Sequence, residues 1–534
     1  MGIHEIGPRT LRNTIGFFDE DPPQSNEEKE WLGSFVLTRI SATDVDDPAR
    51  LIGLAAVIFR QRAENPYRIA RNPERLSMLL AAGVPVFINP AEVEPGKQTP
   101  ILRQSLVDAL DGAKLPVSKG GSAREPVFTP AIHLLGETDA WQEVAEYIQK
   151  YPLGPPPNLA LNPTVYDVRN VERDLEPEDV VILRRAFWNC SKLTLMENQE
   201  GRSGVSTFRA FAALAGDTVG TSRPFEYFVK VGNRDQIAKE YRAYNLSALE
   251  HIPYHLGPRL RLDRCALGAS RGIIVCDYVN GAEKLRDCAK DGRAVPIIAN
   301  LFNTTLRNWL DNMTPIDVPL SEFLTDRMPK KIPKRRQAKI RKLGRTHTAK
   351  ELSDLVQSMA SAPILAGSIH GDLHALNVLV RGGDAIVIDF EKAEDRAPLL
   401  RDLAALESGL FVDGFIGVSR SGTDLLRSVD CLYTGTALLN GRFDLCHPSD
   451  GSAWFFDCVR QIRMHAPQIE RAPGQYALSL AVEFAKKACK DDDFTGHRAL
   501  RGKLTGEDVR ACAYILAQRI LTELADIYGE VAPA

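Results

Sequence analysis

Two short apolar runs separated by a glycine pair constrain the fold of this chain more than any other feature. The runs are Val378–Val380 and Ala385–Ile388, and the four residues between them read Arg-Gly-Gly-Asp. Glycines suit the positive φ angles of a tight turn, so the pattern predicts a β-hairpin. Asn377 precedes the first strand and Asp389 follows the second. The hairpin is therefore expected to bring Asn377 and Asp389 together.

The segment before the hairpin, residues 370–377, reads His-Gly-Asp-Leu-His-Ala-Leu-Asn. It fits the pattern H-x-D-L-x-x-x-N, which in phosphoryl-transfer enzymes is followed by an Asp-Phe pair such as the one beginning at Asp389. Asp372 would accept or orient the proton of the attacking hydroxyl, while Asn377 and Asp389 would hold Mg²⁺ through oxygen atoms. His370 is expected to hydrogen-bond the loop rather than carry a proton. The alternative is an ordinary loop with a buried acid and amide.

The H-G-D-L-H-x-x-N loop followed by I-D-F-E resembles the aminoglycoside phosphotransferase and choline kinase branch of the protein-kinase-like fold. Protein kinases usually carry Arg in place of Gly371 and Gly in place of Glu391, and His374 also fits the phosphotransferase branch. Asp402, within Arg-Asp-Leu-Ala, resembles a structural aspartate of that branch. The resemblance covers roughly residues 178–530. It implies an α+β, two-lobed protein-kinase-like fold, with a strand-rich N-lobe, a helical C-lobe, and ATP and Mg²⁺ as cofactors.

Such a fold requires a lysine on the third N-lobe strand to grip the phosphates. Lys230 lies inside the apolar segment Phe-Val-Lys-Val and is the candidate. An acidic partner is expected on the next helix, where Glu240 is the candidate. Taken alone, Lys230 also fits a surface lysine whose stem packs on the sheet, and Glu240 a solvent-facing helix residue.

The resemblance also implies a glycine-rich turn over the phosphates and a hinge beside the adenine. Gly201 and Gly204 lie between two predicted strands, where their backbone N–H groups would approach the phosphates. Any tight turn uses glycines, so these two are also compatible with a simple hairpin. Main-chain groups near Asp277 and Val279 would hydrogen-bond the adenine.

Residues 1–151 are expected to form a separate small α/β domain. Two apolar, β-branched segments predict buried strands, and helix signals lie between and after them. The strands are Leu54–Phe59 and Val84–Asn89. One helix is expected to begin at Asn72 and to end before Gly83, and two more are expected at Ile101–Leu110 and Asp139–Ile148. This order suggests a doubly wound sheet loosely like a receiver domain, without its phosphoacceptor aspartate. The domain is either a sensing or docking module or a structural unit.

Four boundaries follow from the composition along the chain. We expect the α/β domain over 1–151, a Pro-rich linker over 152–177, the N-lobe over 178–280 and the C-lobe over 281–534. Strands of the N-lobe are predicted at Val180–Phe187, Leu193–Glu197, Thr207–Leu214, Tyr227–Val231 and Ile273–Tyr278. Late helices are predicted at Tyr476–Cys489 and Gly506–Tyr528.

A basic stretch from Arg327 to Lys350 holds eleven Lys or Arg residues and no acid. Such a run usually forms a solvated face or a loop. The alternative is a surface that binds an anionic acceptor, an acidic partner or nucleic acid. Within it, Arg336, Lys339, Ile340 and Leu343 could lie along one helix.

The overall composition excludes several classes. The 66 basic and 69 acidic residues nearly cancel, no apolar run approaches the length of a bilayer span, and the first residues do not form a secretory signal. Nine scattered cysteines, none in a C-x-x-C pair, are typical of reduced thiols. We therefore expect a cytoplasmic protein without membrane association, and the sequence leaves its oligomeric state open.

The predicted activity is transfer of the γ-phosphate of ATP to a hydroxyl of a small molecule, such as an aminoglycoside or amino alcohol. Two alternatives remain. One is a kinase-like effector of a bacterial conflict or regulatory system that acts on a protein or RNA. The other is a pseudokinase scaffold that binds nucleotide without turnover.

Overall fold

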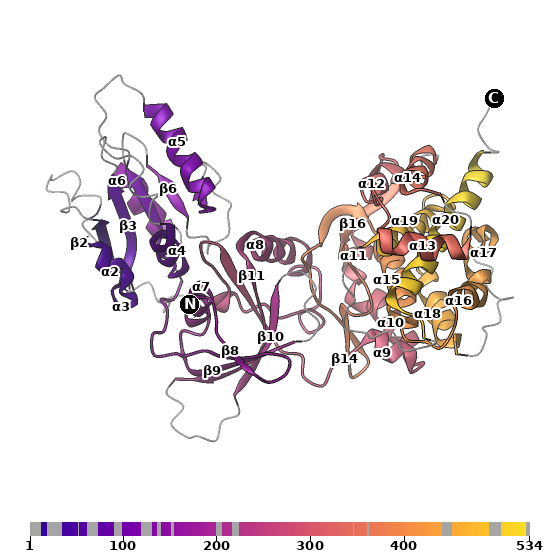
Figure 1. The fold of residues 1–534 in the computed structure, drawn as a ribbon, viewed down its shortest axis with the longest axis horizontal. Helices are drawn as coiled ribbons and strands as arrows, with labels where there is room; N and C mark the ends of the chain where they lie inside the picture. The colour runs from indigo at the N-terminus through magenta and orange to yellow at the C-terminus, as the bar shows by residue number, and fades with distance from the viewer. Residues whose placement is uncertain are drawn as a thin grey trace. The chain divides into compact units, whose positions relative to one another are not determined.

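The structure, a computed structural model, describes residues 12–18, 32, 35–51, 53–60, 73–89, 99–118, 131–135, 140–150, 154–198, 205–215, 224–344, 347–359, 363–440, 451–490 and 503–529. The chain divides into two compact units (Figure 1). Unit one comprises residues 1–242 and 259–278, and unit two comprises residues 243–258 and 279–534. Unit one is built on two sheets, and unit two is mainly helical.

The first sheet of unit one has parallel strands in the order β2-β1-β3-β4-β6-β5. The strands are β1 (Thr14–Phe18), β2 (Val36–Ile40), β3 (Leu54–Arg60), β4 (Val86–Asn89), β5 (Val117–Ser118) and β6 (Ile132–Leu134). The helices are α2 (Ala42–Asp46), α3 (Pro48–Leu51), α4 (Pro73–Ala81), α5 (Thr99–Gly112) and α6 (Ala140–Lys150). The two predicted strands appear as β3 and β4, and the three predicted helices as α4, α5 and α6, so these predictions are confirmed.

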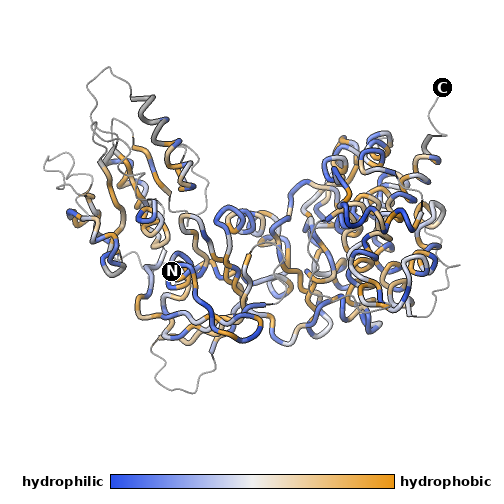
Figure 2. The backbone as a smooth tube through the Cα atoms, in the orientation of Figure 1, coloured by the Kyte–Doolittle hydropathy of each residue, from blue (hydrophilic) through white to orange (hydrophobic). Residues whose placement is uncertain are grey.

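Alternate residues of β3 belong to two different apolar clusters, one on each face of this sheet. Val57 and Phe59 pack in a cluster with Leu79 of α4, whereas Ile58 packs in a cluster with Val144 of α6. Parallel strands buried on both faces are the mark of a doubly wound α/β sheet. Figure 2 shows these strands mostly in the colour of hydrophobic residues. The predicted α/β sheet at the N-terminus is therefore present.

The second sheet of unit one has the strand order β12-β13-β11-β10-β9-β7-β8. Its strands are β7 (Thr164–Tyr166), β8 (Glu172–Arg173), β9 (Cys190–Glu197), β10 (Ser206–Leu214), β11 (Phe225–Asn233), β12 (Ala266–Leu267) and β13 (Arg271–Asp277). Four of the five predicted N-lobe strands are thus confirmed, as β9, β10, β11 and β13. Helix α8 (Arg234–Ala243) follows β11 directly.

The fifth predicted strand, Val180–Phe187, is wrong, because this segment lies in helix α7 (Pro177–Ala186). Proline occupies the first helical turn, Glu178 and Asp179 follow it, and two arginines lie in the last turn. These residues suit the two ends of a helix and its dipole, and they outweigh the β-branched residues between them. Ile182 and Leu183 of α7 pack in the apolar cluster of the second sheet, whereas Val181 packs in a cluster of the first sheet.

Residues 152–177, predicted as a linker, contribute two strands to the second sheet, since β7 pairs with β9 and β8 pairs with β7. The Asn158 side chain also donates a hydrogen bond to the Cys190 carbonyl at 2.8 Å. Part of this segment therefore belongs to the sheet rather than connecting domains. The domain boundaries drawn from the sequence stay predictions.

Two buried arginines close the C-terminal end of α4. Arg185 of α7 donates to the Ala81 carbonyl at 3.0 Å, and Arg12 donates to the carbonyls of Ala82 at 2.8 Å and Gly83 at 3.1 Å. Gly83 has a φ of +76°, and an added Cβ would lie 2.5 Å from the Arg185 guanidinium. Gly83 therefore ends the helix, as predicted, and also leaves room for Arg185. These contacts join the two sheets of unit one.

Unit two contains two three-stranded sheets, in the orders β14-β17-β18 and β15-β16-β19. The strands are β14 (Glu283–Lys284), β15 (Thr314–Ile316), β16 (Ile364–Ile369), β17 (Val378–Arg381), β18 (Asp384–Val387) and β19 (Glu394–Pro398). The helices are α9 (Leu285–Lys290), α10 (Ala294–Asn300), α11 (Arg307–Asp311), α12 (Leu320–Thr325), α13 (Lys334–Leu343), α14 (Ala349–Ser358), α15 (Leu400–Phe415), α16 (Gly422–Val429), α17 (Gly435–Asn440), α18 (Ala453–Arg463), α19 (Gln475–Cys489) and α20 (Gly506–Gly529). The two late helices predicted from the sequence are α19 and α20. Together with α15 and α18 they supply much of the main apolar cluster of this unit.

The predicted hairpin is confirmed in β17 and β18. Val378 pairs with Val387 and Arg381 pairs with Asp384, which leaves the two glycines as the turn. Their φ angles are +61° and +95°, conformations that cost a side-chain-bearing residue free energy. The glycine pair thus sets the register, and the register fixes where the polar residues on either side of the hairpin lie.

Candidate functional site

The candidate loop, residues 370–377, connects β16 to β17 and begins with a fully buried histidine. The Nε2 atom of His370 lies 2.9 Å from the Ile388 carbonyl, and the N–H of Asp372 donates to Nδ1 at 3.3 Å. Since Nδ1 accepts, the proton lies on Nε2 and is donated to the carbonyl. His370 therefore ties the loop to the end of the hairpin, which is the structural role expected from the sequence.

Asp402, in the first turn of α15, holds the start of the loop from the other side. Its two carboxylate oxygens accept the N–H of His370 at 2.6 Å and of Gly371 at 2.9 Å. Burial raises the pKa of Asp402, while His370, Arg401 and the two N–H groups favour its charged form. This is the structural part that the resemblance implied for Asp402.

Gly371 is required by both its backbone conformation and its surroundings. Its φ is +74°, and an added Cβ would lie 2.0 Å from the carbonyl oxygen of Lys392. Heavy atoms cannot approach so closely, so any other residue would displace the loop from Lys392. The glycine that separates this loop from the usual protein-kinase sequence therefore has a steric cause.

Asn377 is buried and fixed at both of its hydrogen-bonding ends. Its backbone N–H donates to the His374 carbonyl at 2.8 Å, and its side-chain Nδ2 donates to the Asp372 carbonyl at 3.1 Å. Because Nδ2 is committed to Asp372, Oδ1 is the atom that would face a cation. An amide oxygen is a suitable ligand for Mg²⁺.

Asp389 follows the hairpin directly and has a φ of +69°, an unusual value for a residue other than glycine. The N–H of Ile388 donates to the Asn377 carbonyl at 2.9 Å, so the hairpin brings the two predicted metal ligands next to each other. Phe390 is buried and packs against His370, with ring centroids 5.2 Å apart. A strained backbone held by packing on both sides is common at functional sites.

Asp372 lies between cationic groups that come from two distant segments. Lys392 forms an ion pair with its carboxylate, and Lys487 of α19 acts on it electrostatically. Burial alone would raise the pKa of Asp372, but the cations Lys487 and Lys392 hold it well below its usual range. Asp372 is therefore a carboxylate across the physiological pH range, as a group that orients a hydroxyl must be.

His374, the second histidine of the candidate loop, is neutral. Its Nδ1 accepts the N–H of Leu376 at 3.3 Å, and burial, reinforced by Lys487, lowers its pKa to about 3. Gly409 of α15 leaves the space that this arrangement needs, since a Cβ there would lie 2.8 Å from the His374 Cβ and 3.6 Å from the Lys487 Nζ. Sequence analysis missed Lys392 and Lys487, and only the position of Lys392 just after the Asp-Phe-Glu segment was a signal for either.

In unit one, the structure brings together Lys230 of β11 and Glu240 of α8. Their side chains form an ion pair of 2.7 Å, and each is only about a tenth exposed, 11% for Lys230 and 10% for Glu240. The alternatives of a surface lysine and a solvent-facing glutamate therefore do not apply. A buried lysine held by a carboxylate is the arrangement that grips phosphates in phosphoryl-transfer enzymes.

Of the four other residues predicted to contact the nucleotide, the structure describes two, Asp277 and Val279. Gly201 and Gly204 lie outside the described residues. The N–H of Asp277 already donates to the Arg259 carbonyl at 3.0 Å, and its carboxylate pairs with Arg261 at 2.6 Å. Val279 is the first residue of the second segment of unit two. Adenine recognition by these main-chain groups stays a prediction.

The basic stretch is partly structural. Arg336 is fully buried, where it donates to Glu507 at 2.7 Å and to the Lys490 carbonyl at 3.1 Å, while Ile340 packs in the main cluster. The residues predicted to lie along one helix are therefore found on α13. The exposed cations of the described part of the stretch are Lys330, Lys331, Lys334, Arg335, Arg341, Lys342 and Lys350. Arg336 thus serves the core of unit two rather than an external anion, while the partly exposed Arg327 and Lys339 pair with Glu394 and Asp508.

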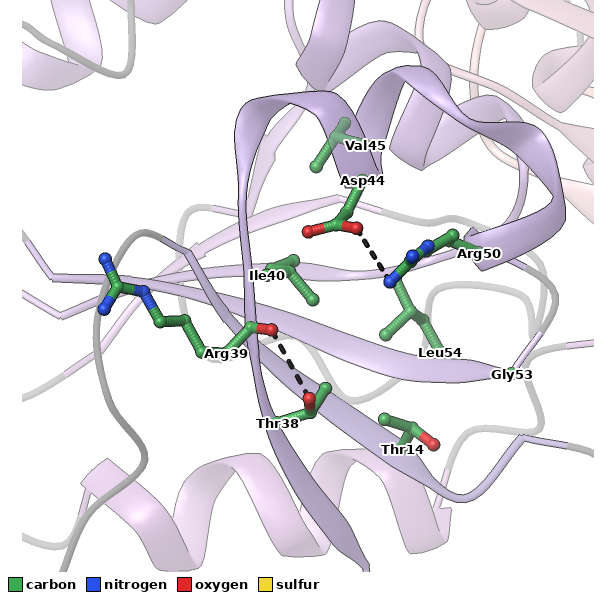
Figure 3. A pocket seen from close by; sticks show the side chains of 9 residues that line it. All are labelled: Thr14, Thr38, Arg39, Ile40, Asp44, Val45, Arg50, Gly53 and Leu54. Carbon is green, nitrogen blue, oxygen red and sulfur yellow. Dashed lines mark hydrogen bonds and ion pairs between the residues drawn. The ribbon is translucent and has the colours of Figure 1, made fainter.

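A small pocket of about 120 Å³ lies in the first sheet of unit one, beside β2 and the start of β3 (Figure 3). Its polar groups are already engaged. Asp44 pairs with Arg50 at 2.9 Å, Thr14 donates to Asn13 at 3.2 Å and Thr38 donates to a main-chain carbonyl at 3.3 Å. The pocket holds none of the residues predicted to act in catalysis.

One family model matches part of this chain. A family model described as Ternary complex associated domain 9 (TCAD9) matches residues 339–476, which include the candidate loop and Asp389. The comparison with curated proteins gave no match. Among the described residues, no helix combines the length and apolar character of a membrane span.

The structural neighbours are aminoglycoside phosphotransferases and small-molecule kinases. A thermostable mutant of aminoglycoside phosphotransferase APH(4)-Ia, bound to ADP and hygromycin B, is 13% identical with a TM-score of 0.33, over 62% of this chain and 93% of that one. A glucosamine kinase bound to glucosamine, ADP and phosphate is 14% identical (TM-score 0.29; 69% and 86% covered), and the APH(3'')-Id enzyme from Streptomyces rimosus is 16% identical (0.27; 50% and 92%). At these TM-scores and identities the neighbours do not identify the activity of this chain. The function proposed below therefore rests on the geometry of the site.

Proposed function

We propose that this protein is a phosphotransferase that moves the γ-phosphoryl group of ATP to a hydroxyl acceptor, with a two-lobed protein-kinase-like fold. Asp372 orients the acceptor hydroxyl and takes its proton. Asn377 and Asp389 hold Mg²⁺, and Lys230, fixed by Glu240, grips the phosphates. Bound Mg²⁺ supplies charge neutralisation on the phosphates, and its proposed ligands are an amide and a carboxylate oxygen, which suit a hard cation.

The observation that carries this proposal is the fixation of the candidate loop. Asp402 accepts two N–H groups of the loop, His370 ties it to the hairpin end, and the Asn377 amide is hydrogen-bonded to Asp372. Phosphoryl transfer needs little covalent chemistry and depends on positioned charge. A loop whose backbone and Asn377 amide are held by these hydrogen bonds meets that need.

The direct test is Mg²⁺-dependent ATP turnover of the full chain, compared with Asp372→Asn. We expect the variant to lose about 10²- to 10⁴-fold in kcat, since a positioned proton acceptor contributes that much. Asp354→Asn is the matched control, because Asp354 lies exposed on α14 and pairs only with Lys350 among the contacts described. Equal turnover of the wild type and Asp372→Asn contradicts the proposal. Nucleotide binding without turnover in the wild type would favour a scaffold instead.

Two classes of acceptor are proposed. The small-molecule class, such as an aminoglycoside or amino alcohol, follows from the resemblance of the loop. The match to a domain described as ternary complex associated supports a second candidate, an effector that phosphorylates a protein or RNA within an assembly. The six exposed cations of residues 330–342 add a surface that suits an anionic macromolecule.

Radiolabelled ATP separates these two candidates. The full chain and its Asp372→Asn variant are incubated with cell extract, and small molecules are then separated from protein and RNA. Label that depends on Asp372 in the small-molecule fraction supports the first candidate. Label in protein or RNA supports the second.

A further inference from the structure

Lys392 has a fixed backbone and a partly exposed side chain. Its carbonyl oxygen lies against Gly371, and the N–H of the next residue donates to the Phe390 carbonyl at 2.9 Å. Its ammonium group, by contrast, belongs to a side chain that is 44% exposed and pairs with Asp372. The lysine is thus anchored beneath the candidate loop, while its charged end reaches the carboxylate from the open side.

We propose that Lys392 is a catalytic residue, whose ammonium group binds the transferring phosphoryl group on the side of the acceptor. The inference rests on the proposed function. The acceptor hydroxyl must hydrogen-bond to Asp372, and its oxygen must come within about 3–3.5 Å of the phosphorus. An ammonium group that touches the same carboxylate is therefore within a few ångströms of the phosphoryl oxygens.

The step balances without any further reactant. The acceptor oxygen forms a bond to the γ-phosphorus while the bond from that phosphorus to the bridging oxygen of ADP breaks. The hydroxyl proton passes to Asp372. Lys392 keeps its proton and donates hydrogen bonds to the phosphoryl oxygens, on which negative charge is spread in the transition state.

Lys487 lowers the free-energy cost of moving the Lys392 ammonium from Asp372 to the phosphoryl group. When Lys392 turns from Asp372 to the phosphoryl group, Lys487 still acts on the carboxylate from α19. Lys487 is rooted in a packed helix, and the missing side chain of Gly409 lets it approach the loop. A partly exposed ion pair such as Lys392–Asp372 is also worth little free energy in itself, so it can be exchanged readily.

The test uses the full chain with ATP, Mg²⁺ and water as the acceptor. We expect Lys392→Met to lose about 10²- to 10³-fold in kcat, as for removal of one charge-stabilising donor, with the KM for ATP nearly unchanged. Lys392→Arg should recover at least part of that loss, because it keeps a cation in place. Lys350→Met is the matched control, since Lys350 lies exposed on α14 and pairs with the exposed Asp354.

A second measurement separates contact with the phosphoryl group from simple support of Asp372. ADP with aluminium fluoride mimics the transferring group, and we expect Lys392→Met to weaken its binding while leaving the binding of ADP alone unchanged. It should also reduce the preference for ATP over ATPγS, whose sulfur replaces a phosphoryl oxygen. Both readouts are independent of the acceptor, and thermal unfolding shows whether the variant is folded.

The outcomes distinguish the two proposals. If the wild type and Asp372→Asn turn over ATP equally, the proposed function fails, and this inference fails with it. If Asp372→Asn is impaired but Lys392→Met matches the wild type, only the inference on Lys392 is overturned. If Lys392→Met loses turnover but binds ADP with aluminium fluoride as the wild type does, Lys392 only positions Asp372, which also overturns it.

Discussion

The two lysine–carboxylate pairs of this molecule differ in how far water reaches them. Lys230 and Glu240 of unit one are each about a tenth exposed and are held between a strand and a helix. Lys392 and Asp372 of unit two are more open, with 44% of the lysine side chain and 21% of the aspartate side chain exposed. A buried pair is costly to break, because one charge is left without a partner, whereas an open pair can be exchanged for water or a ligand.

This difference assigns different tasks to similar chemistry. The enclosed pair is held in one geometry by its surroundings, which suits the proposed grip on phosphates. The open pair suits the proposed exchange, in which the Lys392 ammonium leaves Asp372 for the phosphoryl group during the reaction. Variants of the two pairs, and of the residues that support them, can break or sharpen this comparison.

The largest effect is expected at the enclosed pair. Lys230→Met and Glu240→Gln should each reduce kcat/KM for ATP by about 10²- to 10³-fold, because the phosphates lose a preorganised cation or its anchor. Arg209→Met is the control, since Arg209 pairs with Glu226 on the same sheet but in a more exposed position. Steady-state ATP turnover at several ATP concentrations measures the effect. Wild-type kinetics in both variants would remove this pair from the site.

Gly371→Ala should disturb the Lys392–Asp372 pair through the backbone of Lys392. The new Cβ would meet the Lys392 carbonyl, so the loop or Lys392 must move, and a shift of about 1 Å costs on the order of 10²-fold in rate. Gly292→Ala is a matched control, because Gly292 has nearly the same φ, +73°, but no atom within 4 Å of the added Cβ. Turnover of both variants separates the clash from the backbone strain. Equal losses in the two variants would show that the clash does not matter.

A third ion pair tests burial without catalysis. Arg336 is buried and pairs with Glu507, so Arg336→Met should lower the free energy of unfolding by about 3–5 kcal/mol. Arg341→Met, on the exposed face of the same helix, should change it by less than about 0.5 kcal/mol. Urea unfolding measures both. If the two variants were equally stable, Arg336 would belong to the solvated face of the basic stretch.

The smallest effect concerns pH and unit one. Burial lowers the pKa of His133 to about 4, and its Nε2 has no partner among the described residues. The unfolded chain binds a proton here below about pH 6.5, but the folded chain does so only below about pH 4. The free energy of unfolding should therefore fall as the pH drops from about 6.5 to about 4. In His133→Phe, the slope of that free energy against pH should be smaller by the contribution of about one bound proton.

Hydrogen exchange of peptides covering β4 and β6 follows this local stability across the pH range. The wild type and His133→Phe should show the same pH dependence above pH 7, where the histidine is neutral in both states. An unchanged slope in the variant between pH 4 and 6.5 would mean that His133 takes up its proton in the folded protein.

Local patterns predicted a large part of the structure. The glycine pair between apolar runs identified the hairpin, and the Asn-Pro-Glu start with Gly83 identified α4. The spacing of the candidate loop singled out Asp372, Asn377 and Asp389 because those residues lie near one another in the sequence. Helix α7 was missed, because its β-branched residues hid the helix signals at its two ends.

The residues that only the tertiary structure could assign are those whose partners are distant in the sequence. The order of residues determined the hairpin, the loop and the doubly wound sheet, because turns, caps and periodicity act over a few residues. The packing of α19 and α13 decided that Lys487 faces Asp372 and that Arg336 points inward. Burial and charge at these positions depend on which segments pack together, and no local pattern contains that information.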